Sequence, residues 1–372
     1  MVADRTTSTL ARLGVGPERL LTSAIDAPTP DLQFLPLQPP VAIPPVEVHH
    51  VDEDAPATDR YREMHTTWPA SHTAHAGIVT ARRVHVSMPT GMHRWRRRVV
   101  EEALLGVDAL RNPKYLAAFA HTAVPGQLSL AEGVLLALPW NHNFYHWMVE
   151  QLPRLALVDE VHELRDVPLL VPASAPAFVT ESLRLCGYDD RALHLDDGVY
   201  RVDTMHIPSR LSTASNVSPL ALQWLDARFP DAPPAGRRIY VSRADAAIRT
   251  VSNEHEVARM LELELGFETV VVSHLSLADQ VRLFREAAVI VGAHGAALAH
   301  VAFAPRGSAL VEIFQDGHFS QCYGLMATMR GMRYGLLVAA RRGLSMHVDV
   351  NALRRVVGEA VAAVERHRRE HG

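Results

Sequence analysis

Cysteine is nearly absent from this sequence, which has only Cys186 and Cys322. Two cysteines so far apart show no metal-ligand spacing and build no disulfide framework, so we expect buried thiols in a reducing compartment. Long apolar runs are also lacking. The N-terminal stretch has no apolar signal-peptide core, and the most apolar window, around residues 287–305, is interrupted by histidine and glycine. We therefore expect a cytoplasmic protein without a membrane span.

A strong charge of either sign is missing as well. The formal net charge is −4 over 372 residues, which gives no reason to expect a nucleic-acid polymer or an anionic membrane as a partner. With 48% apolar and 21% charged residues, the composition is that of an ordinary globular protein of about two domains. The bias toward arginine, alanine and valine, with very little lysine, indicates a bacterial source with a GC-rich genome.

Composition and periodicity divide the chain into four parts. Residues 1–60 are rich in proline, which excludes a long helix and favours an extended arm with short strands. This arm either packs on its own body or mediates a homodimer. Strands and helices alternate over residues 61–235 and again over 236–345, which is typical of parallel, doubly wound sheets. Residues 346–372 form an amphipathic C-terminal helix.

One charged run stands out before the middle of the chain. Residues 93–104 place four arginines ahead of two glutamates. The run is either an anion-binding patch or a solvated helical face with internal Arg–Glu pairs. We favour the helical face because runs of charge usually face solvent.

The chain is organised around residues 287–314, which predict a strand, a tight turn, a helix and a second strand. Residues 288–291 form a short β-branched run typical of a strand buried on both faces. His294, Gly295 and Ala296 follow in the turn, where free backbone N–H groups and the positive end of a helix suit a phosphate. The alternative is a helix packed closely on a sheet, with glycines that only relieve crowding.

A second polar cluster follows a predicted strand over residues 133–140. Asn141 is the expected helix N-cap, and His142, His146 and Glu150 then fall at i, i+4 and i+8 on one helical face. Such residues suit a general base with an orienting carboxylate. They also suit a three-ligand metal site, or a partly exposed helix whose polar groups are satisfied locally.

The second half of the chain predicts a Rossmann-like unit of about a hundred residues. A strand over residues 238–243 ends in Ser242 and Arg243, and Arg249 follows in a loop. The next helix has a capped start at Ser252 and stops at Gly266.

Three segments in this order resemble a known family. Residues 143–155 (NFYHWMVEQLPRL), 242–257 (SRADAAIRTVSNEHEV) and 275–314 are similar to the successive motifs of glycosyltransferase family 61. The family includes protein O-linked and mannose-linked N-acetylglucosaminyltransferases and plant xylan xylosyl- or arabinosyltransferases. The resemblance covers about residues 130–340.

The resemblance implies an α/β protein of the GT-B type, with two Rossmann-like domains facing a cleft. It implies an inverting enzyme that uses a nucleoside-diphosphate sugar, needs no metal or other cofactor, and acts on an unknown acceptor. Donor contacts are then carried over onto seven positions. Ser242, Arg243 and Arg249 would hold the diphosphate, His294, Gly295 and Ala296 the phosphates or sugar, and Glu312 the ribose; Glu312 is alternatively a solvated carboxylate at a strand end.

The resemblance also assigns the acceptor side. His146 is the expected base for the acceptor hydroxyl, because its ordinary pKa suits proton abstraction near neutral pH. Glu150 either orients His146 or acts as the base itself, and Asn143, Trp147 and His142 lie on the acceptor side. The rival functions are a metal-dependent hydrolase or lyase built on His142, His146 and Glu150, a non-catalytic nucleotide-sugar-binding protein, and a nucleotide-sugar epimerase.

Overall fold

The computed structural model describes residues 20–51, 56–67, 71–104, 108–123, 128–211, 216–229, 232–233 and 235–371. These residues divide into two compact units. Unit 1 takes residues 20–41 and 73–211, and unit 2 takes the described residues between 42 and 72 together with 216–371. Part of the expected arm, residues 1–19 and 52–55, lies outside the described residues.

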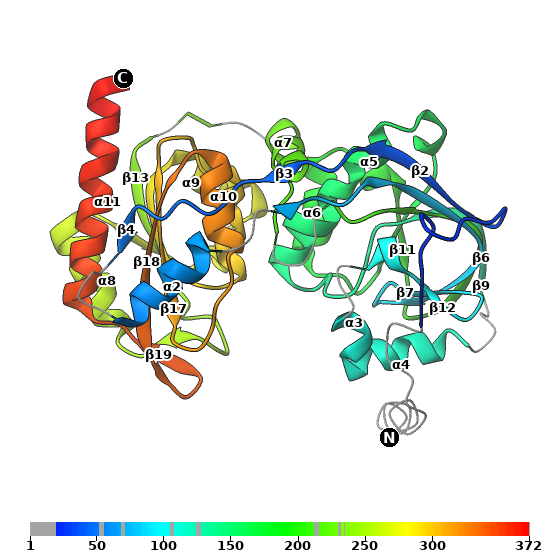
Figure 1. Ribbon diagram of the computed structural model, residues 1–372, viewed down its shortest axis with the longest axis horizontal. Helices are drawn as coiled ribbons and strands as arrows, with labels where there is room; N and C mark the ends of the chain where they lie inside the picture. Colours follow the sequence, from blue (N-terminus) through cyan, green and yellow to red (C-terminus); the bar gives the residue numbers. More distant parts are fainter. Residues whose placement is uncertain are drawn as a thin grey trace. The chain divides into compact units, whose positions relative to one another are not determined.

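Unit 1 is a mixed sheet with helices packed around it (Figure 1). Its strands and helices are β1 (Leu21–Thr22), β2 (Leu32–Gln38), β6 (Ala76–Met88), β7 (Met92–Trp95), β8 (Val99–Val100), η2 (Glu101–Ala103), α3 (Asp108–Arg111), α4 (Pro113–His121), β9 (Leu128–Leu135), η3 (His146–Gln151), η4 (Leu152–Arg154), α5 (Leu155–Asp159), η5 (His162–Leu164), β10 (Leu169–Pro172), α6 (Ala177–Leu185), η6 (Asp189–Arg191), β11 (Ala192–Leu195) and β12 (Gly198–Pro208).

The main sheet of unit 1 has the strand order β11-β10-β9-β12-β6-β2, and β7 also pairs with β6. β11, β10, β9 and β12 are parallel to one another, as predicted. The prediction of a fully parallel sheet is wrong, because β6 runs antiparallel to β12, β2 and β7. The sequence of β6 carries the reason: Arg82 and Arg83 are exposed while Val79 and Val84 are buried, and antiparallel sheets tolerate one solvated face.

The predicted helix over residues 93–104 is also wrong. This segment forms β7, β8 and the short helix η2. Trp95 and Arg98 exchange backbone hydrogen bonds, and the left-handed backbone of Arg96 (φ 54°) turns the chain between them. The expected Arg–Glu pairing within the run is replaced by a longer-range contact, in which Glu102 accepts a hydrogen bond from Ser23 at 2.6 Å.

Unit 2 carries the Rossmann-like sheet. Its strands and helices are β3 (Ala42–Ile43), β4 (His50–Val51), α2 (Pro56–Thr66), β5 (Ser71–His72), α7 (Pro219–Arg228), β13 (Arg237–Val241), β14 (Thr250–Val251), α8 (Glu254–Leu265), β15 (Glu268–Val270), η7 (Val272–His274), α9 (Leu277–Glu286), β16 (Ala287–Ala293), η8 (Ala296–Phe303), β17 (Ala309–Gln315), α10 (Cys322–Arg330), β18 (Arg333–Arg342), β19 (Ser345–His347) and α11 (Val350–His371).

The strands of unit 2 follow the order β14-β19-β18-β17-β16-β13-β15. All pairs from β18 to β15 are parallel, which confirms the doubly wound prediction for this half. After β13 and the short edge strand β14, the chain adds β15 on one side of β13 and then returns to add β16 on the other. The sheet therefore has a topological switch point between β13 and β16, where open α/β sheets bind ligands.

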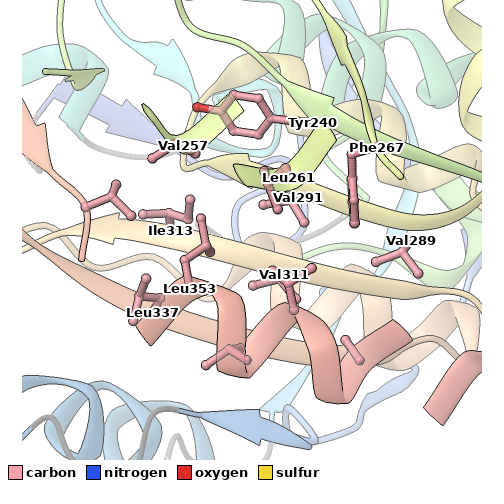
Figure 2. Close-up of a cluster of buried hydrophobic side chains, with 14 of the residues drawn as sticks. Tyr240, Val257, Leu261, Phe267, Val289, Val291, Val311, Ile313, Leu337 and Leu353 are labelled. Carbon is pink, nitrogen blue, oxygen red and sulfur yellow. The ribbon is translucent and has the colours of Figure 1, made fainter. Parts of the chain in front are cut away.

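The core of unit 2 lies between the sheet and the helices α8 and α11. Figure 2 shows Leu353 of α11 packed against the side chains of Val311 and Leu337, while Val257 and Leu261 of α8 join the same cluster. Helices α9 and α10 lie on the opposite side of the sheet (Figure 1). The predicted amphipathic C-terminal helix is thus confirmed. In the described part of the chain, no helix is both long and apolar enough to cross a membrane.

The N-terminal segment is extended, as expected, but it is not a separate arm. β2 pairs with β6 of unit 1, and β4 pairs with β18 of unit 2. The residues predicted as either a dimer contact or a self-packing arm therefore pack on their own chain over these strands. Because residues 42–72 belong to unit 2, the compact units do not coincide with the expected borders after residues 60 and 235.

Buried neutral histidines predict an acid-labile fold. His93 is fully buried; its Nε2 accepts from the backbone N–H of Val100 and its Nδ1 donates to the carbonyl of Gly91. Burial lowers the pKa of His93 from 6.5 to about 4, with a smaller effect from Arg154. The unfolded chain therefore takes up this proton first, so stability is complete above pH 6.5 and is lost as the pH falls toward 4, by up to about 3 kcal/mol for this residue.

We expect urea titrations between pH 7.5 and 4.5 to show this loss. His93→Gln should flatten the pH dependence, since an amide can donate to Gly91 and accept from Val100 without titrating. The exposed His162 provides the control, and His162→Gln should leave the slope unchanged. A free energy of unfolding that stays constant over this pH range would contradict the prediction.

Candidate active site

The first cluster of candidate residues lies at the carboxyl edge of the unit 2 sheet. Arg243 follows β13, His294 and Gly295 follow β16, and His318 follows β17, so these residues leave neighbouring strands at the switch point. Gly295 gives Arg243 room: a Cβ at this glycine would lie 1.5 Å from the Arg243 Nη1 atom. The Tyr323 hydroxyl fixes the same turn by donating to the Gly295 carbonyl at 2.7 Å.

Two arginines at this edge lack a carboxylate partner. Arg243 is buried and donates from Nε to the Arg249 carbonyl (3.0 Å) and from Nη2 to the Ile248 carbonyl (2.8 Å). Burial and the charge of Arg249 both lower the pKa of Arg243. Within the described residues neither guanidinium forms an ion pair, and the buried Nε of Arg249 has no hydrogen-bond partner. This leaves an excess of positive charge and free N–H donors where an anion would be stabilised.

His294 is held by a buried hydrogen-bonded chain. Its Nδ1 donates to the Glu312 carboxylate at 2.5 Å, and Tyr334 donates to the other Glu312 oxygen at 2.7 Å. His65 of α2 lies 3.3 Å from the Tyr334 hydroxyl, and burial lowers its pKa to about 4, so it stays neutral. Because a carboxylate only accepts, Glu312 fixes the His294 tautomer and leaves Nε2 for a ligand.

The structure places two of the predicted donor residues, Glu312 and Ser242, differently from the expectation. Glu312 is 0% exposed and both its oxygens are bound to protein, so it orients His294 and neither contacts a ribose nor lies in solvent. The Ser242 hydroxyl donates to Glu254 at 2.9 Å and supports the turn after β13. Ala296 begins η8, the predicted helix after the turn, which is of the 3₁₀ type.

The second cluster lies on the helix after β9 in unit 1. Residues 146–151 adopt a wide π-helical turn, followed by a tight 3₁₀ turn over η4. Pro153 explains the change, because proline has no N–H to donate and its ring clashes with the carbonyl four residues earlier. π-helical turns often occur at functional sites.

His146 and Glu150 meet on this turn, as predicted. The His146 Nδ1 donates to the Glu150 carboxylate at 2.6 Å. Glu150 is buried, whereas 31% of the His146 side chain is exposed. The His146 ring also lies 5.6 Å from the ring of Trp140. The carboxylate thus holds Nδ1 protonated and turns the basic Nε2 outward, which is the arrangement a general base needs.

The other residues predicted around this helix have different roles. Asn143, and not Asn141, caps the helix, since its side chain accepts from the N–H groups of Tyr145 and His146. Trp147 is 0% exposed and donates to Ser182 at 2.8 Å, so it is a core residue and cannot contact an acceptor. His142 lies before the helix in a turn, and not on the face shared by His146 and Glu150.

The alternative metal site is not formed by the folded chain. Among the residues that the structure describes, no three His, Cys, Asp or Glu side chains come together in a group that would hold a metal ion. This includes His142, His146 and Glu150, of which only the last two are in contact. The two cysteines are buried, as expected.

Two histidines near His294, His318 and His65, were not predicted from the sequence, because neither belongs to a recognisable motif. His318 faces His294 at a ring distance of 4.8 Å, and burial with the charges of His294 and Arg249 lowers its pKa to about 4. His65 reaches the network from the N-terminal segment, which showed no motif. His65 lies just beyond the proline-rich residues 1–60, and no spacing or motif marks it in the sequence.

Comparison with known proteins agrees with this geometry. Residues 144–311 match the family model Glycosyltransferase 61. The EGF domain-specific O-linked N-acetylglucosamine transferase of Bos taurus is 25% identical over 142 residues, which cover 37% of this chain and 24% of that protein. The protein O-linked-mannose beta-1,4-N-acetylglucosaminyltransferase 2 of Bos taurus is 35% identical over 105 residues, with coverage of 27% and 18%. The beta-1,2-xylosyltransferase of Arabidopsis thaliana is 40% identical over 67 residues, with coverage of 17% and 12%.

The family match therefore includes the parallel strands β13, β15 and β16 of the Rossmann-like sheet in unit 2. The match of residues 144–311 to the model of glycosyltransferase family 61 confirms the resemblance seen in the sequence. The segments aligned with these relatives span about a quarter or less of the relatives' length. Residues 144–311, which match the family model, contain both His146 with Glu150 and the turn with His294.

Proposed function

We propose that the protein is an inverting glycosyltransferase that moves a sugar from a nucleoside-diphosphate sugar to an acceptor hydroxyl without a metal ion. The observation that carries this proposal is the pair of arginines at the switch point of unit 2, Arg243 and Arg249, whose guanidinium groups form no ion pair within the described residues. A leaving diphosphate gains negative charge, and fixed guanidinium groups stabilise that charge in place of a cation.

Direct displacement with inversion also needs a base for the acceptor hydroxyl. We assign this role to His146, with Glu150 as the carboxylate that orients it and stabilises the imidazolium formed by proton uptake. The proposal includes a GT-B arrangement, in which unit 1 serves the acceptor and unit 2 holds the nucleotide. The names of the relatives suggest N-acetylglucosamine or xylose as the sugar to test first.

The nucleotide site is tested by binding. We expect one nucleoside diphosphate, from a panel of bases with and without N-acetylglucosamine or xylose, to raise the melting temperature in the presence of EDTA. Calorimetry should then show that Arg243→Met weakens the affinity by roughly 10- to 100-fold, because a hydrogen bond to a charged group is worth about 1.5–3 kcal/mol.

The exposed Arg259 of unit 2 provides the matched control, and Arg259→Met should bind as the native protein does. An unchanged affinity in Arg243→Met would remove this arginine from the site. Binding that EDTA abolishes would contradict a metal-independent reaction. Tight nucleotide binding without transfer to any acceptor would favour the non-catalytic alternative.

A further inference from the structure

A small pocket opens in unit 1 next to the proposed base. It has a volume of about 120 Å³, and its walls include Thr90, Lys114, Tyr115, Trp140 and His142. Trp140 connects it to the reaction centre, because its ring lies 5.6 Å from the His146 ring. A group bound here would therefore lie beside the base, on the acceptor side of the proposed reaction.

Lys114 gives this pocket its charge. It is the only lysine among the 37 lysine and arginine residues of the chain. Asn112 caps α4 by accepting from the Lys114 backbone N–H at 3.0 Å, which fixes the backbone at this position. Lys114 is exposed and its ammonium forms no ion pair in the described chain; it lies 5.7 Å from the centre of the Tyr115 ring. The positive charge is thus available to a ligand.

Tyr115 adds a second donor without an acceptor. Its hydroxyl accepts from the Trp140 backbone N–H at 2.8 Å, and its own proton has no hydrogen-bond acceptor among the described residues. The side chain is buried, with 2% exposure, and burial raises its pKa, so the hydroxyl keeps its proton. A buried hydroxyl proton needs an acceptor, which a ligand in the pocket would supply.

The remaining polar groups of the pocket are neutral or already bonded. Thr90 donates to the Ser87 carbonyl, and Asn141 donates to the Pro89 carbonyl. Burial and the charges of Lys114 and His146 lower the pKa of His142, so this ring stays neutral at pH 7. No carboxylate is part of the described wall, although Ser174 of the wall donates to the exposed Asp197.

We propose that this pocket is an acceptor subsite that binds an anionic group, a carboxylate or a phosphate, through the ammonium of Lys114 and the hydroxyl of Tyr115. The acceptor class rests on the proposed function, whereas the anion site itself does not. An ammonium and a hydroxyl that converge on one oxyanion form short, charge-assisted hydrogen bonds. The indole of Trp140 forms the apolar side of the pocket, against which a sugar ring or an alkyl chain would pack.

The single lysine makes a direct test possible. Amine acetylation of the native protein modifies only Lys114 and the N-terminal amine, and mass spectrometry measures the two rates separately. We expect glucuronate or glucose 6-phosphate, at about two to nine times its dissociation constant, to slow acetylation of Lys114 by roughly three- to tenfold, because only the unliganded fraction reacts. Glucose, which shares the ring and lacks the charge, should not protect it, and the N-terminal amine is the internal reference at matched ionic strength.

The two anions distinguish the source of the ligand group. Protection by glucuronate alone assigns a carboxylate, protection by glucose 6-phosphate alone assigns a phosphate, and protection by both supports the shared chemistry. Tyr115→Phe, which keeps the ring, should reduce the protection several-fold. Tyr200→Phe is the matched control, since the Tyr200 hydroxyl bonds to the Asp196 carbonyl away from the pocket.

Equal protection by glucose, or no protection by either anion, would overturn the proposal. The proposal would also be overturned if the anions protected Lys114 as well in Tyr115→Phe as in the Tyr200→Phe control. The acetylation assay needs neither a nucleotide nor sugar transfer. A failure of nucleotide binding would therefore contradict the glycosyltransferase proposal without affecting the test of the anion site.

Discussion

Replacing His146 by alanine is expected to lower the rate of sugar transfer by roughly 10²–10⁴-fold, the usual contribution of a positioned general base. The imidazole is the group that Glu150 orients at 2.6 Å with Nε2 free. Its removal leaves water as the base. The nucleotide affinity should stay within about twofold of the native value, because the proposed diphosphate ligands belong to unit 2. Steady-state transfer rates and calorimetry on the same preparation measure both effects.

The control for this prediction is His162→Ala, which removes an exposed histidine of unit 1 away from the pocket. Glu150→Gln provides a graded test. The amide no longer stabilises the imidazolium, so we expect a smaller loss than in His146→Ala and a shift in the pH profile of transfer. Full transfer activity in His146→Ala would eliminate it as the base. A loss in Glu150→Gln that exceeds the loss in His146→Ala would assign the base to Glu150.

Replacing Glu312 by alanine is expected to cost about 2–6 kcal/mol of the free energy of unfolding, since it leaves two buried donors unsatisfied at about 1–3 kcal/mol each. The substitution leaves His294 and the Tyr334 hydroxyl without their acceptor in a region where Glu312 is 0% exposed. The stability loss should appear as a lower urea midpoint for the transition of unit 2. Nucleotide affinity should fall as well, because the orientation of His294 is lost.

Glu268→Ala is the matched control in the same sheet. Glu268 pairs with Arg237 at 2.6 Å, but 42% of its side chain is exposed, and exposed pairs contribute below about 1 kcal/mol. We expect the two variants to differ by at least about 1 kcal/mol on these grounds. If Glu312→Ala were no less stable than Glu268→Ala, the buried network would not be what holds His294.

Local spacing predicted the features that depend on neighbours in the chain. His146 and Glu150 are four residues apart, so any helical turn brings them together, including the π-helical turn that forms. Continuous apolar runs likewise predicted the buried strands β16 and β17 and their parallel pairing. The position of His294 at a strand end followed from the same pattern.

Sequence periodicity did not predict which way several side chains point. Trp147 belongs to the motif of the base, yet it is fully buried against Ser182, 35 residues further on. Glu312 lies in an apolar strand whose pattern does not show that Tyr334 satisfies its second oxygen. The Arg-rich run after β6 became a hairpin because β7 pairs with β6.

The sequence by itself determined the strand and helix rhythm, the parallel sheet of unit 2 and the His146–Glu150 pair, because these depend on contacts within a few residues or on the burial of whole segments. Only the tertiary structure brought His65 of α2 to Tyr334, set Arg243 over Gly295, and placed Lys114 beside Trp140. The physical reason is that each of these contacts joins groups held by different strands and helices, and their distance is set by the packing of the sheet and not by their spacing along the chain.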